Sequence, residues 1–174
     1  LNGNLSLEGI KKNYTKKVKA IILVHLNGFP CDMDPIIAFA RKHKIKIIED
    51  CSQAHGSKIG NKYVGSFGDI SVYSFCQDKI LSTGGEGGMI ATNNKNLYEK
   101  IWSLKDIGKN RKKYFNINYS SNNFPYVHDS IGTNARMTEI QSCIGNYQLN
   151  KLKDYIKIRN KNANFYSERL KNCK

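Results

Sequence analysis

Residues 20–50 read AIILVHLNGFPCDMDPIIAFARKHKIKIIED and predict the architecture of the chain. The run Ala20–His25 is nearly all apolar, which is typical of a strand buried on both faces of a parallel sheet. Asp34-Pro35 then suit the N-cap and first position of a helix that extends to about His43. A second apolar run, Ile45–Asp50, follows. Strand, helix and strand in this order predict a parallel, right-handed β-α-β unit.

Outside this unit the pattern predicts further short strands and longer helices. A polar stretch at 1–17 reads as a linker or partial helix, and 108–130 is a long polar segment of the kind that is functional or lacks fixed structure. The predicted strands lie at 63–64, 70–75 and 89–92, and the predicted helices at 94–106, 136–149 and 152–170. The sequence therefore predicts an α/β fold, a mainly parallel sheet flanked by helices.

Composition limits the class of protein. The net charge of +14 would suit a nucleic-acid or acidic partner, but the basic residues are spread along the chain without an RNA-binding or zinc-finger motif. A basic binding module therefore stays the alternative and rests on charge alone. The five cysteines form no Cys-x-x-Cys pair, so we assign no metal site and no disulfide framework. No apolar run is long enough for a membrane span and no signal peptide is evident, so a cytoplasmic protein is expected.

A single lysine stands between a strand and a glycine-rich bend. Residues 71–89 read SVYSFCQDKILSTGGEGGM, with Lys79 on the strand-exit loop and Ser74 near the strand end. Glycines allow positive φ angles and close approach of the backbone to a ligand. Lysine becomes a nucleophile when burial or a neighbouring cation disfavours its charge. Lys79 is therefore predicted to be a nucleophile that forms a covalent bond to a ligand. The alternative is that it is an ordinary surface lysine.

Asp50 ends a predicted strand, and ligands in open α/β sheets bind outside the carboxyl ends of the strands. A strand-end acid and a strand-exit lysine are the two groups that a pyridoxal phosphate enzyme needs, because the lysine forms the Schiff base and the carboxylate pairs with the pyridinium nitrogen. A turn-forming role for Asp50 and a loop role for Gln53 and His55 remain the alternatives. The phosphate-binding loop and dinucleotide motifs are absent, and no spacing supports a cysteine hydrolase.

Several ordered segments carry a family resemblance. They are VHLNG (24–28), DMD (32–34), DCSQAHG (50–56), GSFGDI (65–70), SFCQDK (74–79), GGEGGM (84–89) and GTNARMTEIQ (132–141). Together they resemble the DegT family of sugar-nucleotide aminotransferases, which are fold-type I pyridoxal phosphate enzymes. The resemblance runs over roughly residues 18–153, and several motifs in family order make it far more specific than any one of them.

The resemblance implies a role for each matching residue. Lys79 would form the Schiff base and later shuttle the proton. Asp50 would keep the pyridinium nitrogen protonated, Gln53 would hydrogen-bond near the phenolic oxygen of the cofactor, and Ser74 would bind its phosphate. Asn134 would reach the phosphate of the neighbouring subunit's cofactor. The lysine also argues against the related sugar dehydratases, some of which carry histidine at this position.

The resemblance further implies the substrates and the assembly. The expected reaction is transamination of a nucleotide-linked keto sugar, with glutamate as amino donor, for cell-surface polysaccharide or glycan synthesis. A homodimer with shared active sites is expected. Residues 18–150 would be part of the cofactor-binding large domain, 1–17 an N-terminal linker, and 151–174 a helix leading to a C-terminal small domain. The family's N-terminal phosphate-binding turn and its small domain have no counterpart here, so the isolated chain is expected to be nearly inactive.

Overall fold

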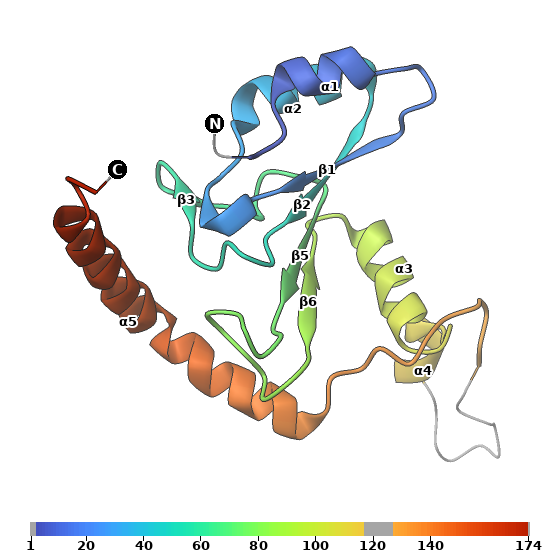
Figure 1. Cartoon of the computed structure of the whole chain (residues 1–174). Helices are drawn as coiled ribbons and strands as arrows, with labels where there is room; N and C mark the ends of the chain where they lie inside the picture. The colour runs from blue at the N-terminus through green and yellow to red at the C-terminus, as the bar shows by residue number, and fades with distance from the viewer. Residues whose placement is uncertain (1–2, 117–126, 174) are drawn as a thin grey trace. The chain divides into compact units, whose positions relative to one another are not determined.

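The computed structural model describes residues 3–116 and 127–173 (Figure 1). Its main sheet has four strands in the order β1-β2-β5-β6, and β2 pairs in parallel with both β1 and β5. These strands are β1 (Ala20–Val24), β2 (Lys46–Asp50), β5 (Ile70–Ser74) and β6 (Gly88–Ala91). A two-stranded antiparallel ribbon joins β3 (Lys58–Ile59) and β4 (Lys62–Tyr63). The predicted α/β fold with a mainly parallel sheet is confirmed.

The helices of the chain flank the sheet or follow it in sequence. They are α1 (Leu7–Asn13), α2 (Met33–His43), α3 (Lys95–Lys105), α4 (Arg111–Phe115) and α5 (Glu139–Arg169), and a short 3-10 turn spans Leu26–Gly28. None of the helices in the described part of the chain combines the length and the apolar character needed to cross a membrane. By contact density the chain forms two compact units, Leu1–Ile90 with Glu139–Lys174 and Ala91–Thr138.

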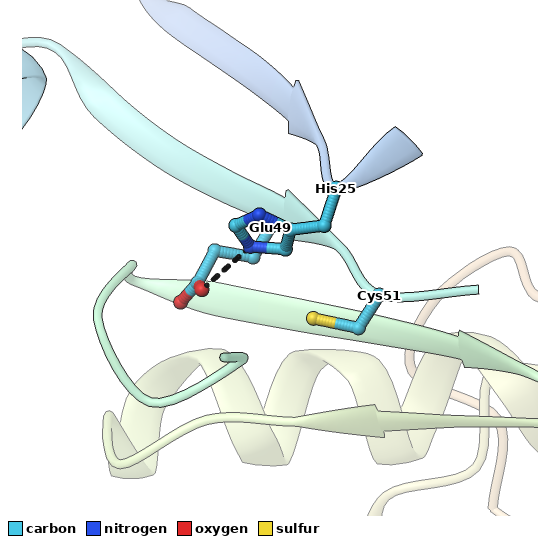
Figure 2. A group of neighbouring side chains, drawn as sticks. All are labelled: His25, Glu49 and Cys51. Atoms are coloured by element: carbon cyan, nitrogen blue, oxygen red, sulfur yellow. Dashed lines mark hydrogen bonds and ion pairs between the residues drawn. The ribbon is translucent and has the colours of Figure 1, made fainter. Parts of the chain in front are cut away.

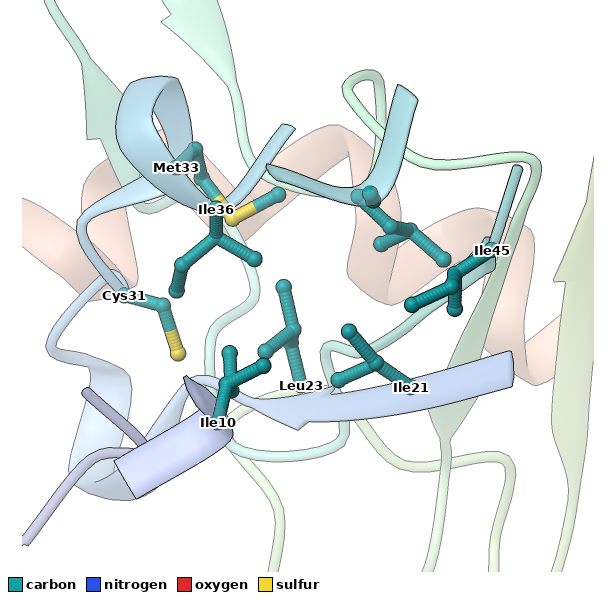
Figure 3. Close-up of a cluster of buried hydrophobic side chains, with 9 residues drawn as sticks. Ile10, Ile21, Leu23, Cys31, Met33, Ile36 and Ile45 are labelled. Carbon is teal, nitrogen blue, oxygen red and sulfur yellow. The ribbon is translucent and has the colours of Figure 1, made fainter. Parts of the chain in front are cut away.

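The core of the first unit lies between α1, α2 and one face of β1 and β2 (Figure 3). Leu23 and Ile36 are fully buried at its centre. Each such side chain contributes about 1.5–3 kcal/mol on leaving water. The core residues are Ile10, Ile21, Leu23, Cys31, Met33, Ile36, Ala40, Ile45 and Ile47. The β-α-β unit predicted from residues 20–50 therefore supplies most of this core.

Burial of β1 on both faces was predicted and is wrong for this chain. Ile22 is 61% exposed and Val24 39% exposed, whereas Ile21 and Leu23 alternate with them on the buried face. The helices α1 and α2 pack on one face of the sheet only (Figure 1). A continuous apolar run predicts a strand but does not specify on which of its two faces other parts of the chain pack.

Two helix predictions also need correction. The helix after β1 begins at Met33, and its N-cap is Asp32 rather than the predicted Asp34, two residues later. Met33 is buried, so its packing in the core favours a helix that already includes this residue. The break predicted between residues 149 and 152 is absent, and α5 is one helix of 31 residues. The predicted polar segment 108–130 contains the short helix α4, and residues 117–126 of it lie outside the described residues.

Candidate active site

The candidate site lies where the parallel strands β1, β2 and β5 reach their carboxyl ends. Residues 25–31 follow β1, residues 51–57 follow β2, and residues 75–87 follow β5. Because parallel strands release their loops at the same edge of a sheet, these three loops come together there. A cavity of about 680 Å³ opens between them and α5, within the range that binds cofactor-sized ligands. It is lined by Asn27, Gly28, Phe29, Ser52, Gln53, His55, Gly56, Ser57, Asp78, Lys79, Ile80, Ile156, Arg159 and Asn160.

Lys79 projects into this cavity from the turn that follows β5. The turn is closed by a hydrogen bond from the Lys79 N–H to the Cys76 carbonyl (3.0 Å). The side chain of Lys79 is 21% exposed, and its Nζ lies 3.1 Å from the carboxylate of Asp78. The side chain of Lys79 is therefore partly buried, its Nζ forms an ion pair with Asp78, and it lines the cavity.

Gln53 lines the same cavity as Lys79. Its Oε1 accepts a hydrogen bond from the N–H of Asn27 (2.7 Å). A backbone N–H can only donate, so this contact fixes which end of the amide faces Asn27. The NH₂ group of Gln53 is the end left to donate to a ligand.

Asp50 and Ser74 share one face of the sheet. Asp50 pairs with Val72 in the parallel register, and Ser74 lies two residues beyond Val72 on the same side of the strand. Oδ1 of Asp50 accepts from the N–H of Ser52 (2.9 Å), and Oγ of Ser74 accepts from the N–H of Cys76 (3.3 Å). Each contact holds the side chain beside its strand end. Neither residue lines the cavity that contains Lys79.

Asn134 belongs to the second compact unit, Ala91–Thr138. It pairs with Asp106 in an isolated antiparallel bridge, and its Oδ1 accepts from Nε of Arg136 (3.1 Å). Arg136 also donates to Asp106 (2.8 Å), whose carboxylate lies 3.4 Å from Nζ of Lys109. Asn134 is thus held by a network of charged groups, and its place relative to Lys79 stays a prediction.

The glycine-rich segment after Lys79 fits under α5. Gly84 has φ +81°, and a Cβ there would lie 2.9 Å from Ile144 of α5. Gly56 has φ +82° in the loop after β2, and a Cβ there would overlap Ile156 of α5. Hydrogen bonds from α5 complete the contact, since Oε1 of Gln148 accepts from the N–H of Ser82 (3.0 Å). These glycines let the helix approach closely enough to form one wall of the cavity.

His55 lines this cavity together with Lys79, although the sequence around it predicted only a role in the loop. Burial lowers the pKa of His55; a hydrogen bond to the Ser74 backbone opposes the shift and the charge of Lys79 adds to it. Its buried Nε2 has no hydrogen-bond partner among the described residues. Arg159 of α5 was missed altogether, because a helix far along the chain carries no local signal of the loops it will face.

The sequence matches the DegT/DnrJ/EryC1/StrS aminotransferase family over residues 2–174. The chain is 41% identical over 166 residues to the GDP-perosamine synthase of Escherichia coli O157:H7, covering 95% of this chain and 42% of that protein. It is 39% identical over 163 residues to the dTDP-3-amino-3,6-dideoxy-alpha-D-galactopyranose transaminase of Aneurinibacillus thermoaerophilus, covering 94% of this chain and 41% of that protein.

Solved structures agree with the sequence comparison. An aminotransferase from Psychrobacter cryohalolentis superposes with a TM-score of 0.84 at 47% identity, over 88% of this chain and 38% of that one. Helicobacter pylori PseC, an aminotransferase of pseudoaminic acid biosynthesis, superposes with a TM-score of 0.88 at 29% identity, over 98% of this chain and 43% of that one. The chain spans about two fifths of the length of the relatives that it matches.

Proposed function

Because the chain belongs to the DegT/DnrJ/EryC1/StrS aminotransferase family, we propose that the protein carrying it is a pyridoxal phosphate-dependent aminotransferase. Its acceptor would be a nucleotide-linked keto sugar, its donor glutamate, and its product an amino sugar for cell-surface polysaccharide or glycan synthesis. The observation that carries the proposal is the position of Lys79. Its partly buried side chain lines a cavity together with Gln53, and this cavity lies beyond the end of β2, the strand that ends in Asp50.

The residues present fit this cofactor. Pyridoxal phosphate offers an aldehyde, a ring nitrogen, a phenolic oxygen and a phosphate. The amine of Lys79 and the amide NH₂ of Gln53 lie in the cavity, and the carboxylate of Asp50 and the hydroxyl of Ser74 lie outside its lining, at the ends of the neighbouring strands β2 and β5. His55 also lines the cavity, although its Nε2 is buried and has no hydrogen-bond partner among the described residues. When bound, the cofactor supplies an aldehyde that accepts amino groups and a ring that withdraws electrons.

The resemblance to the family assigns these residues separate tasks. Nζ of Lys79 would hold the cofactor and, when released, move the proton at the carbon that carries the amino group. Asp50 would keep the ring nitrogen protonated, Ser74 would donate its hydroxyl proton to a phosphate oxygen, and Gln53 would donate to the phenolic oxygen. Asp78 pairs with the Lys79 ammonium at 3.1 Å, so Lys79 must leave this ion pair before it reacts.

The test is direct observation of the cofactor on Lys79. Pyridoxal phosphate is added to the full-length protein, the adduct is reduced with borohydride, and the modified peptide is mapped by mass spectrometry. We expect a single phosphopyridoxyl group on Lys79, together with a visible absorption band before reduction. Lys79→Ala should abolish the band and turnover, whereas Lys62→Ala, on the exposed strand β4, should leave both unchanged. A Lys79→Ala protein with full turnover would rule the assignment out.

We also propose a homodimer in which Asn134 of one subunit completes the site around Lys79 of the other. Mixing two inactive variants separates this arrangement from a site built within one chain. A dimer of Lys79→Ala and Asn134→Ala subunits would contain one site with both residues intact, so activity should return on mixing. No return of activity in a proven mixed dimer would refute the shared site.

A further inference from the structure

A second polar cluster lies inside the first unit, away from the lining of the cavity. His25, Glu49 and Cys51 are all fully buried, and their side-chain ligand atoms lie within 4.8 Å of one another (Figure 2). These three residue types can surround a metal ion in other proteins. The hydrogen bonds that each group already makes decide whether they can do so here.

Glu49 is saturated by protein donors. Oε1 accepts from the N–H groups of Phe67 (2.7 Å) and Gly68 (2.5 Å). Oε2 accepts from the N–H of Gly65 (2.6 Å) and faces Nε2 of His25 (3.1 Å). Burial alone would raise the pKa of Glu49, but the bonds from His25 and the three N–H groups outweigh it and lower that pKa. Glu49 is therefore an ionised carboxylate with both oxygens in use.

His25 has neither nitrogen free for a metal. Nδ1 accepts a hydrogen bond from the N–H of Cys31 (3.0 Å), so it carries no proton. The proton then lies on Nε2 and is donated to Glu49. The Cys51 sulfur is a thiol, because burial and the charge of Glu49 raise its pKa to about 12. The cluster is a closed network of the protein's own groups.

The network reaches the cavity through the loop after β1. The bond from Cys31 to His25 closes residues 25–31, which contain the turn Leu26–Gly28. Asn27 in that turn has φ +54°, a conformation that a non-glycine residue adopts only when its surroundings hold it. Its N–H is the group that fixes the amide of Gln53 at 2.7 Å. Hydrogen bonds thus join Glu49 to His25, His25 to Cys31 and Asn27 to Gln53, and the loop backbone links Cys31 to Asn27.

We propose that His25 is a positioning residue that anchors the 25–31 loop, so that Asn27 holds Gln53 with its NH₂ group directed to the cofactor. The inference rests on the proposed function only for the identity of the ligand that Gln53 meets. Glu49 fixes the tautomer of His25, and Nδ1 of His25 holds the Cys31 end of the loop. Side chains of Asn4 and Ser57 hold the loop at Leu26, Phe29 and Gly28. The two nitrogens therefore have separate tasks, which two substitutions can separate.

Asparagine and glutamine each keep one of these nitrogens. His25→Asn places an acceptor near the position of Nδ1, so it keeps the anchor for Cys31 and loses the contact with Glu49. His25→Gln places a donor near the position of Nε2, so it keeps the contact with Glu49 and loses the loop anchor. Both variants should be less stable than the wild type. Only His25→Gln should release Gln53.

The experiment uses the full-length protein and two readouts. Hydrogen exchange of the amides in 25–31 is measured without cofactor, and the dissociation constant for pyridoxal phosphate is measured by absorption titration. We expect His25→Gln to speed exchange at Cys31 and Asn27 and to weaken cofactor binding about three- to tenfold, the effect of one hydrogen bond. His25→Asn should stay close to the wild type in both. Gln53→Ala should weaken binding by the same factor as His25→Gln, with no further loss in the double variant.

The outcomes separate this inference from the proposed function. Equal exchange and equal affinity in the two His25 variants would overturn the positioning role while leaving the aminotransferase assignment intact. A wild type that takes up no pyridoxal phosphate would overturn the proposed function, and the exchange data would still decide whether His25 anchors the loop. If neither variant folds, wild-type exchange decides: unprotected amides at both Cys31 and Asn27 would refute the anchor, and protection at both would support it.

Discussion

Replacing Glu49 by glutamine is a sharp test of the buried network, because it preserves shape and removes one acceptor. The carboxylate of Glu49 receives four hydrogen bonds, two on each oxygen. A glutamine amide has one oxygen and one NH₂ group. In one orientation the NH₂ faces the N–H groups of Phe67 and Gly68. In the other it faces the N–H of Gly65 and Nε2–H of His25, so two donors lose their acceptor in either case.

The size of the effect follows from this count. A hydrogen bond to a charged group contributes about 1.5–3 kcal/mol, and a buried donor left without a partner costs a similar amount. Two lost bonds therefore predict that Glu49→Gln lowers the free energy of unfolding by about 3–6 kcal/mol. Total stabilities of domains are about 5–15 kcal/mol, so this is a severe change for a substitution that alters no volume.

Urea unfolding of the cofactor-free, full-length protein at neutral pH measures this loss. Glu99→Gln is the matched control, since Glu99 meets Arg111 at 3.4 Å with both side chains partly exposed. Partly exposed pairs of this kind contribute about 0–1 kcal/mol, so the control should unfold almost as the wild type does. A Glu49→Gln protein within about 1 kcal/mol of its control would refute the saturation argument, since that is the scale of an exposed pair.

The difference in unfolding free energy between the wild type and Glu49→Gln should depend on pH. The pKa of Glu49 is lowered in the folded protein, so the unfolded chain binds the proton more readily. The stability from the ionised carboxylate is then fully present above the unfolded pKa of about 4.3 and is lost as the pH falls through the lower folded value. The gap in unfolding free energy between wild type and Glu49→Gln should therefore narrow below about pH 4. A gap that widens on acidification would contradict the sign.

Three further predictions concern single positions. Gly65→Ala should destabilise by about 2–4 kcal/mol, because φ is +89° and a Cβ would overlap the Tyr73 hydroxyl, whereas Gly60→Ala, at φ +57° with open space, should cost about 1 kcal/mol by urea unfolding. Cys51 should resist iodoacetamide at pH 8 until the protein is unfolded, because its pKa is raised to about 12, and equal labelling of native and unfolded protein by mass spectrometry would contradict this. Asp50→Asn should lower turnover at saturating cofactor by about 10²–10⁴-fold, and unchanged steady-state rates would exclude its role.

The β-α-β unit and the segment around Lys79 could be predicted from local sequence. Apolar runs at 20–25 and 45–50 set two parallel strands because each run is too short for a helix and is bounded by turn residues. The family motifs place Asp50, Gln53 and Lys79 by type and order. Strand ends of a parallel sheet meet at one edge, so this order predicts a common site. The structure brings Gln53 and Lys79 into one cavity and leaves Asp50 outside its lining.

The tertiary structure alone decided which groups actually touch. The bond between His25 and Glu49 joins residues 24 positions apart, and their polar character in apolar strands gave no sign of their partners. The exposure of Ile22 and the approach of α5 to Gly56 likewise depend on which elements cover which face. The local sequence pattern determines the preferred backbone conformation of a residue and the face of the strand on which its side chain lies. Its contact partners depend on how distant segments of the chain pack. The wall that α5 adds to the cavity of Lys79 therefore became visible only in the folded chain.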